Sequence, residues 1–108
     1  MCINTGGEKV FPEEVEEALK QHASVRDAVA DGIPNSRFGE TICAVVEAAP
    51  GQTPVLEELS DHVKSHLAHY KAPRHLVFVD SIGRAPNGKV PYRRLTALAS
   101  TQLGVATL

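Results

Sequence analysis

Helical stripes and short apolar runs alternate along the chain, and proline or glycine residues separate them. This alternation leaves few choices of fold, because the helices must cover a sheet built from the neighbouring runs. The first stripe follows Pro12, which suits a first helical position, and predicts a helix over residues 12–22. Glu16 and Lys20 stand one turn apart, and we expect them to pair on the exposed face of this helix.

Two more helices are expected further along the chain. Leucine and valine residues at helical spacing indicate a helix over residues 54–69, with Thr53 as its cap. Pro73 prevents this helix from continuing. The last helix is predicted over residues 92–100, with Pro91 at its start.

The apolar runs between the helices predict short β-strands. Residues 25–33 and 41–48 are rich in small and β-branched side chains and are expected to form a hairpin with a long loop. Residues 76–79 form a continuous apolar run, which fits a strand buried on both faces. A stub of strand at residues 2–4 ends at a Gly-Gly break, because glycines adopt backbone angles that other residues avoid.

The order of elements places the chain in the α+β class. It matches the split β-α-β-β-α-β arrangement, a two-layer unit with helices on one face of a small sheet, to which a C-terminal helix is added. The other face of that sheet then needs cover from elsewhere, which makes a partner surface an expectation. A length of 108 residues fits a single domain.

Composition excludes several classes of protein. Hydrophobic residues make up 43% and charged residues 22%, as in an ordinary globular chain rather than a disordered or fibrous one. Asp and Glu total 13 against 11 Lys and Arg, which argues against binding to nucleic acid. Two cysteines allow at most one disulfide, and we see no signal peptide or membrane-spanning run, so a cytoplasmic location is expected.

Positive charge gathers near the end of the chain, where residues 81–95 carry four Lys or Arg and no acidic residue. Residues 83–90 have the glycine and lysine spacing of a phosphate-binding loop, but Val90 stands where a Ser or Thr should hold magnesium. Pro86 also removes an amide that could cradle phosphate. What remains is Lys89 on a Gly- and Pro-rich loop, from which a flexible ammonium group could reach an anion on another domain. An ordinary exposed loop lysine is the alternative.

Two other groups of residues carry weaker signals. His62, His66 and His69 recur at one-turn and two-turn spacing, which brings a metal site into consideration. Val63 occupies the place where the helical zinc-protease signature has its glutamate, so we favour a polar helix edge and expect no metal. Cys43 lies within an apolar run and is interpreted as a core residue rather than a catalytic thiol. Hydrolase chemistry has no support, because no GxSxG sequence is present.

Two separated segments of the chain resemble the C-terminal domain of the adenylate-forming acyl-CoA synthetases. They are INTGGEKVFPEEVEEAL (residues 3–19) and YKAPRHLVFVDSIGRAPNGKVPYRRL (residues 70–95). In that family a large N-terminal domain binds ATP and the carboxylic acid, and the small C-terminal domain adopts one orientation for each half-reaction. The resemblance implies that residues 1–108 are the C-terminal lid domain of a longer AMP-forming fatty-acid–CoA ligase and are inactive alone.

The resemblance also implies roles for individual residues. Lys89 would enter the active site for adenylation, where its charge lowers the repulsion between the substrate carboxylate and the α-phosphate. Gly6 and Gly7 would then line the tunnel for the pantetheine of CoA, because the absence of side chains permits a close approach. Tyr70 and Lys71 fall where some relatives touch the CoA nucleotide, although surface charge explains them equally well.

The resemblance implies ATP, Mg²⁺ and CoA as cofactors of the full-length enzyme, with none bound tightly by this domain alone. The expected partners are the N-terminal domain of the same enzyme, the carboxylic acid substrate and CoA. Two alternatives remain open. One is the small domain of a peptide-synthetase adenylation unit, which delivers the acyl group to a carrier-protein thiol. The other is a stand-alone split β-α-β module that binds a partner or an anion.

Overall fold

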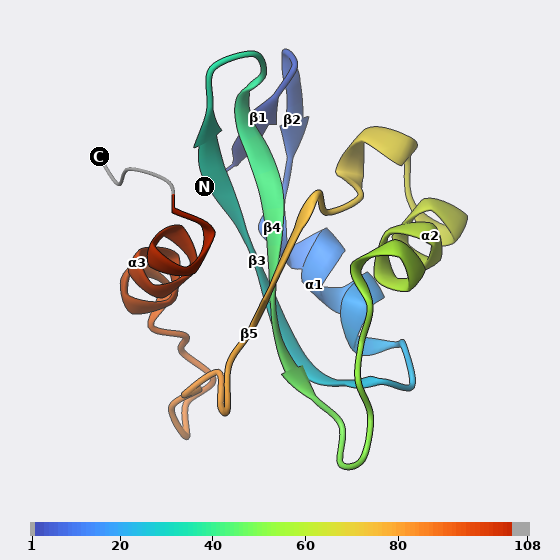
Figure 1. Ribbon diagram of the computed structural model, residues 1–108, viewed down its shortest axis with the longest axis vertical. Helices are drawn as coiled ribbons and strands as arrows, with labels where there is room; N and C mark the ends of the chain where they lie inside the picture. Colours follow the sequence, from blue (N-terminus) through green and yellow to red (C-terminus); the bar gives the residue numbers. More distant parts are fainter. Residues whose placement is uncertain (1, 105–108) are drawn as a thin grey trace.

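The computed structural model describes residues 2–104 and has one five-stranded sheet with helices on both of its faces (Figure 1). In chain order the elements are β1 (Ile3–Thr5), β2 (Glu8–Val10), α1 (Pro12–Lys20), β3 (Val25–Asn35), β4 (Gly39–Ala48), α2 (Leu56–His66), the 3₁₀ turn η1 (His69–Lys71), β5 (His75–Phe78) and α3 (Tyr92–Leu103). The predicted α+β class is confirmed. None of the helices described within residues 2–104 is long and apolar enough to cross a membrane.

Strand β4 occupies the centre of the sheet. It pairs antiparallel with β3 along one edge, over almost the whole length of both strands. Along its other edge it pairs in parallel with β5. Near its start it also pairs antiparallel with β1, where Gly39 lies opposite Thr5. Residues 36–38 alone connect β3 to β4, because Pro34 and Asn35 still belong to β3. The prediction of a long loop between these strands is therefore wrong.

Each face of the sheet has its own buried cluster, because successive strand residues point to opposite faces. Under α1 and α2 the buried strand residues include Ala28, Ala30, Ile42, Ala44 and Val46, which contact Val15, Leu19, Leu59 and Val63. Under α3 they are Val29, Ile33, Cys43, Val45 and Val77, which contact Ile82, Leu95 and Ala99. The second face was expected to need cover from elsewhere, but the chain's own α3 covers it.

The observed helix ends differ from the predicted ones, because contacts with the rest of the fold help to determine where each helix begins and ends. Helix α1 ends at Lys20. At its start, Glu14 Oε2 accepts a hydrogen bond from the Phe11 N–H at 3.3 Å. Helix α2 begins at Leu56 without a side-chain cap, so the expected capping role of Thr53 is wrong. The pairing of Glu16 with Lys20 is also wrong, because Glu16 is buried and Lys20 Nζ instead lies 2.8 Å from Glu17.

Strand β5 is less enclosed than its apolar composition suggested. Val77 is buried in the cluster under α3, and Leu76 packs against the opposite cluster, so the strand does contact both faces. Phe78 is nevertheless 44% exposed at the end of the strand. Burial on both faces therefore holds for the middle of β5 but not for its end.

We predict that Leu19→Ala lowers the free energy of unfolding by about 2–5 kcal/mol, because Leu19 is fully buried and its removal leaves a cavity. Leu98→Ala is the matched control, since the same atoms are deleted from a side chain that is 39% exposed, and it should cost about 1 kcal/mol or less. Chemical denaturation measures both values. Equal losses would contradict the division between core and surface described above.

Candidate functional site

Lys89 lies on the exposed loop between β5 and α3. Three hydrogen bonds close this loop on itself: Gly88 N–H donates to Ala85 O at 2.8 Å, Ala85 N–H donates to Lys89 O at 2.8 Å, and Lys89 N–H donates to Asn87 Oδ1 at 3.1 Å. Gly88 has a φ of 85°, which favours glycine at this turn. These amides are engaged within the loop, which agrees with the rejection of a phosphate-binding loop.

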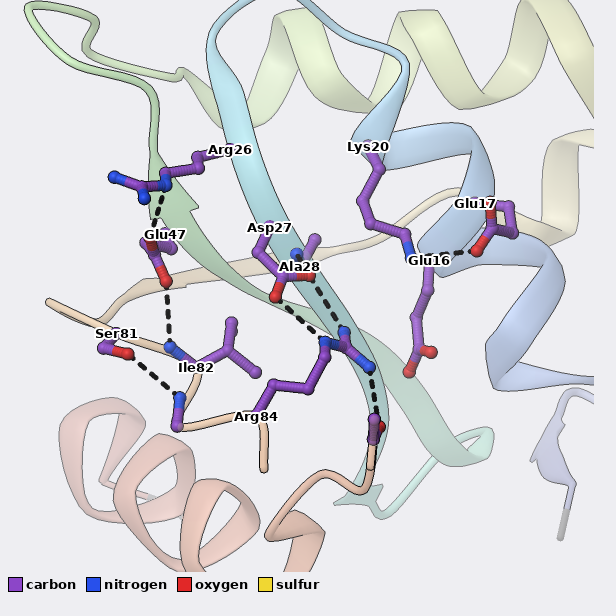
Figure 2. Close-up of polar contacts among 12 residues, drawn as sticks. Glu16, Glu17, Lys20, Arg26, Asp27, Ala28, Glu47, Ser81, Ile82 and Arg84 are labelled. Atoms are coloured by element: carbon purple, nitrogen blue, oxygen red, sulfur yellow. Dashed lines mark hydrogen bonds and ion pairs between the residues drawn. The ribbon is translucent and has the colours of Figure 1, made fainter. Parts of the chain in front are cut away.

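The base of the loop is fastened to the sheet through Arg84. Figure 2 shows its guanidinium against Asp27 of β3, with Nε 3.1 Å from Oδ2 and Nη2 2.9 Å from Oδ1. The remaining nitrogen, Nη1, donates to Gly88 O at 3.2 Å. Just before this point Ile82 is buried, and its N–H donates to Glu47 Oε1 at 3.1 Å. One side chain therefore joins β3 to the residue that precedes Lys89.

The Arg84–Asp27 pair is charged at neutral pH. Burial on its own would raise the pKa of Asp27, but hydrogen bonds from Arg84 and from Ala28 N–H, together with the Arg84 charge, hold that pKa below its usual value. Hydrogen bonding to Asp27 in turn raises the pKa of Arg84. The contribution of this carboxylate to stability is therefore present above the pKa of Asp27 in the unfolded chain, and it is lost as the pH falls through the folded value.

Gly6 and Gly7 form the tip of the β1–β2 hairpin. Both have positive φ angles, 58° and 85°, so glycine is required by the turn itself. Gly6 N–H donates to Phe38 O at 2.9 Å, which ties the tip to the turn between β3 and β4. A Cβ at Gly7 would meet no heavy atom within 4 Å. This glycine therefore faces open space, where a ligand could approach the backbone closely.

A cleft of about 560 Å³ opens beside the Gly6 backbone. Its lining also includes Thr5, Glu8, Phe38, Ser60, Lys64, His69, Tyr70, Ala72, Pro73 and Arg74. The Phe38 ring centroid lies 4.6 Å from the Arg74 guanidinium carbon and 5.3 Å from that of Arg37. Tyr70 is 44% exposed. The cleft thus combines aromatic rings with basic side chains and can accept an anion that carries a flat ring.

Lys71 does not line this cleft, although its Nζ lies 5.8 Å from the centroid of the Tyr70 ring. Its Nζ lies 2.6 Å from Glu14 Oε1 on α1, and its side chain is only 20% exposed. The hydrogen bond to Glu14 is the main cause of the raised pKa of Lys71. The structure therefore brings Tyr70 and Gly6 together and places Lys71 in a separate ion pair. Glu14 lies 57 positions earlier, so spacing around Lys71 gave no signal of this partner.

The two candidate sites lie at opposite ends of the molecule. The Lys89 loop is joined to Asp27 near the start of β3, and the Gly-Gly tip is joined to the turn that follows Asn35 at its end. Eight residue steps of extended strand separate these points by about 26 Å. Figure 1 shows the hairpin of β1 and β2 and the loop before α3 at opposite ends of the sheet. While the chain keeps a single orientation, the two sites cannot contact the same small ligand.

The histidines form polar contacts at the helix edge. His62 Nε2 lies 2.7 Å from Ala18 O, and the His62 ring packs edge-on against His22 and His66 with centroids 5.1 and 4.6 Å apart. His69 lines the cleft instead of joining them. Within residues 2–104, no group of three or more His, Cys, Asp or Glu side chains has an arrangement that could hold a metal ion.

Comparisons with known proteins place this geometry in context. A family model described as the AMP-binding enzyme C-terminal domain matches residues 14–89. The chain is 55% identical over 93 residues to a Mycobacterium tuberculosis protein named medium/long-chain-fatty-acid–CoA/3-oxocholest-4-en-26-oate–CoA ligase, and this match covers 86% of the chain and 17% of that protein. The chain therefore spans about one sixth of the length of this relative.

Solved structures agree with the sequence matches. The crystal structure of Brucella canis acyl-CoA synthetase is 31% identical to the chain with a TM-score of 0.86, over 95% of this chain and 20% of that one. The amide bond synthetase McbA from Marinactinospora thermotolerans is 34% identical with a TM-score of 0.83, over 90% of this chain and 20% of that one. Each is similar to the chain over a small part of a longer protein.

We predict that Cys43 resists thiol reagents while the chain is folded. Burial, followed by the nearby charge of Asp31, raises the pKa of its thiol to about 12, so almost no reactive thiolate is present at pH 8. A Cys2→Ser variant isolates Cys43, and its labelling should require unfolding. Labelling of the folded variant as fast as the denatured one would contradict this interpretation.

Proposed function

The chain belongs to the AMP-binding enzyme C-terminal domain family, and we propose from this premise that it is the mobile small domain of an ATP-dependent acid–CoA ligase. In the first half-reaction a carboxylate attacks the α-phosphate of ATP, which gives an acyl-adenylate and releases pyrophosphate. In the second, the thiol of CoA attacks the acyl carbon and releases AMP. The names of the relatives support a medium- or long-chain or sterol-derived acid as the substrate.

The separation of the two candidate sites is the observation that carries this proposal. Lys89 lies at one end of β3 and β4, and Gly6 and Gly7 lie with the aromatic cleft at the other. A domain that turns between two orientations would present each end to the same reaction centre in turn. Two half-reactions that need different groups at one centre are the chemistry that fits such an arrangement.

Lys89 would act in the first half-reaction. A carboxylate that approaches a phosphate brings two anions together, and a positioned ammonium group lowers this repulsion while charge redistributes in the transition state. Within residues 2–104 no donor set suits a metal ion, so the preceding domain would bind Mg²⁺ together with ATP and the acid. Both cysteines are free thiols, which supports the cytoplasm as the compartment of the proposed enzyme.

The Gly-Gly tip and the cleft would act in the second half-reaction. Gly6 and Gly7 allow pantetheine to pass close to the backbone. The cleft beside them would hold the nucleotide of CoA, with its base against the exposed ring of Tyr70 and its phosphates near Arg74. Lys71, also assigned to CoA by resemblance, would have to leave Glu14 before it could contact a phosphate.

The test of this function is Lys89→Ala in the full-length enzyme. Adenylation, measured by pyrophosphate exchange, should fall by about 10²–10³-fold, because one stabilising group of the transition state is lost. Thiolation of supplied acyl-adenylate should persist. Arg93→Ala removes a neighbouring exposed charge and should leave both half-reactions unchanged. Equal losses in the two half-reactions would refute the role assigned to Lys89.

Tyr70→Ala tests the cleft. We expect the KM for CoA to rise about tenfold, because one stacking contact is lost, while adenylation is unchanged. With pantetheine, which lacks the nucleotide, the variant should match the unaltered enzyme. Phe11→Ala removes another exposed aromatic ring, on the surface at the start of α1, and serves as the matched control. A rise in KM that is the same for CoA and pantetheine would show that Tyr70 does not contact the nucleotide.

An amine is a second candidate for the acyl acceptor. The similarity to an amide bond synthetase supports it, because the first half-reaction would be the same and only the acceptor differs. Supplying acyl-adenylate together with CoA or with an amine distinguishes the two functions. Faster consumption with CoA supports the ligase, and faster consumption with the amine supports the amide-forming enzyme.

A further inference from the structure

The loop that carries Lys89 is held at both of its ends. At its start Arg84 donates two hydrogen bonds to Asp27, as Figure 2 shows, and its Nη1 donates a third to Gly88 O. At its far end Tyr92, the first residue of α3, donates its phenolic O–H to Glu16 of α1. Only two residues lie between Lys89 and Tyr92. The loop is therefore fixed on either side of the lysine.

Glu16 is the centre of the second attachment. The residue is buried, with only 6% of its surface exposed. Oε2 accepts the Ala30 N–H of β3 at 2.9 Å and lies 2.8 Å from the Tyr92 hydroxyl, with Oε1 at 3.0 Å from the same hydroxyl. A buried carboxylate is costly to keep unless each oxygen has a partner. This arrangement joins α1, β3 and α3 at one point.

The hydroxyl of Tyr92 holds its proton more firmly than an exposed tyrosine does. Burial, and then the hydrogen bond to Glu16, raises the pKa of Tyr92 above its usual value. The link to Glu16 therefore persists as the pH rises past neutrality. The other attachment, between Arg84 and Asp27, consists of two charged groups and persists as well.

Neither attachment forms an ion pair with the Lys89 ammonium group. Among residues 2–104, the ion pairs of 4.0 Å or less join other side chains and do not involve Lys89 Nζ. Arg84 and Tyr92 bind the loop backbone or its ends, so they can act on the ammonium group only by fixing where the backbone of Lys89 lies.

We propose that Glu16 and Arg84 are positioning residues for the adenylation step: through Tyr92 and Asp27 they hold both ends of the Lys89 loop against β3, and so direct the Lys89 ammonium group. This inference rests on the proposed function of Lys89. A loop held at two points has fewer conformations to lose when the lysine meets its target. Small misplacements of a reacting or stabilising group are costly in rate, because its alignment with the reacting atoms is lost.

The experiment uses the full-length enzyme with Tyr92→Phe, which removes one hydroxyl and keeps the ring. Adenylation should fall about tenfold, while thiolation of supplied acyl-adenylate stays within about twofold of the unaltered enzyme. Thr101→Val removes a hydroxyl from the same helix that bonds only within that helix, and it should change neither rate. Equal losses in the two half-reactions would indicate general destabilisation and would overturn the inference.

A double-mutant cycle separates this inference from the proposed function. If Tyr92 acts through Lys89, the tenfold effect of Tyr92→Phe should disappear when Lys89 is already alanine. If Lys89→Ala lowers adenylation but the Tyr92→Phe effect persists in full beside it, the positioning role is wrong and the function stands. If Lys89→Ala leaves adenylation intact, the function itself fails, and the positioning role fails with it.

Arg84→Lys provides a second variant that does not depend on a buried group. It keeps the positive charge but lacks the fork that binds both oxygens of Asp27. We expect adenylation to fall in this variant too, with thiolation unchanged and the effect again absent beside Lys89→Ala. Full adenylation by Arg84→Lys would show that charge alone is needed at this position, and the proposed positioning role of Arg84 would be wrong.

Discussion

The antiparallel pairing of β3 with β4 holds two separate buried clusters on opposite faces of one sheet, and the rest of the molecule is attached to this pair. Alanines at 28, 30 and 44 keep one face shallow, so α1 and α2 can approach the strands closely. Larger side chains such as Ile33 and Val45 meet α3 on the other face. Because both faces are buried, a shift of register by one residue would exchange the two clusters, and the pairing is strongly specified.

The spacing of apolar residues predicted the helices and strands that bury an apolar face. It did not predict strands that are held mainly by hydrogen bonds to a neighbouring strand. The apolar residues at helical spacing in α1 and the continuous apolar run of β5 were visible in the sequence. Strand β2 was missed, because Glu8 and Lys9 are exposed and only Val10 is buried, so no alternation marks it. The extension of β3 through Pro34 was missed as well. Proline lacks an amide donor and is tolerated there because this side of β3 is an edge of the sheet.

The candidate site also has residues that the sequence analysis singled out and residues that only the folded structure reveals. Lys89 and the two glycines were singled out by two short segments that resemble the family, and their roles remain predictions. The cleft was not predicted, because Phe38, Ser60 and Arg74 come from separate segments that only the folded sheet brings together. Glu16 was taken for an exposed helix residue because it stands one turn from Lys20, with which it was expected to pair. In the fold its carboxylate is buried and accepts a hydrogen bond from Tyr92, which lies 76 positions later in the chain.

A stiff sheet explains why two sites on one small domain would require movement of the whole domain. About 26 Å of paired strand separate the attachment of the Lys89 loop from the Gly-Gly tip. A lysine side chain covers only a fraction of that distance, and its loop is fixed at both ends by Arg84 and Tyr92. Under the proposed function, local flexibility would therefore not be enough to bring each site in turn to one reaction centre. Rotation of the whole domain would be enough, because contacts between domains are weaker and more polar than the core within each of them.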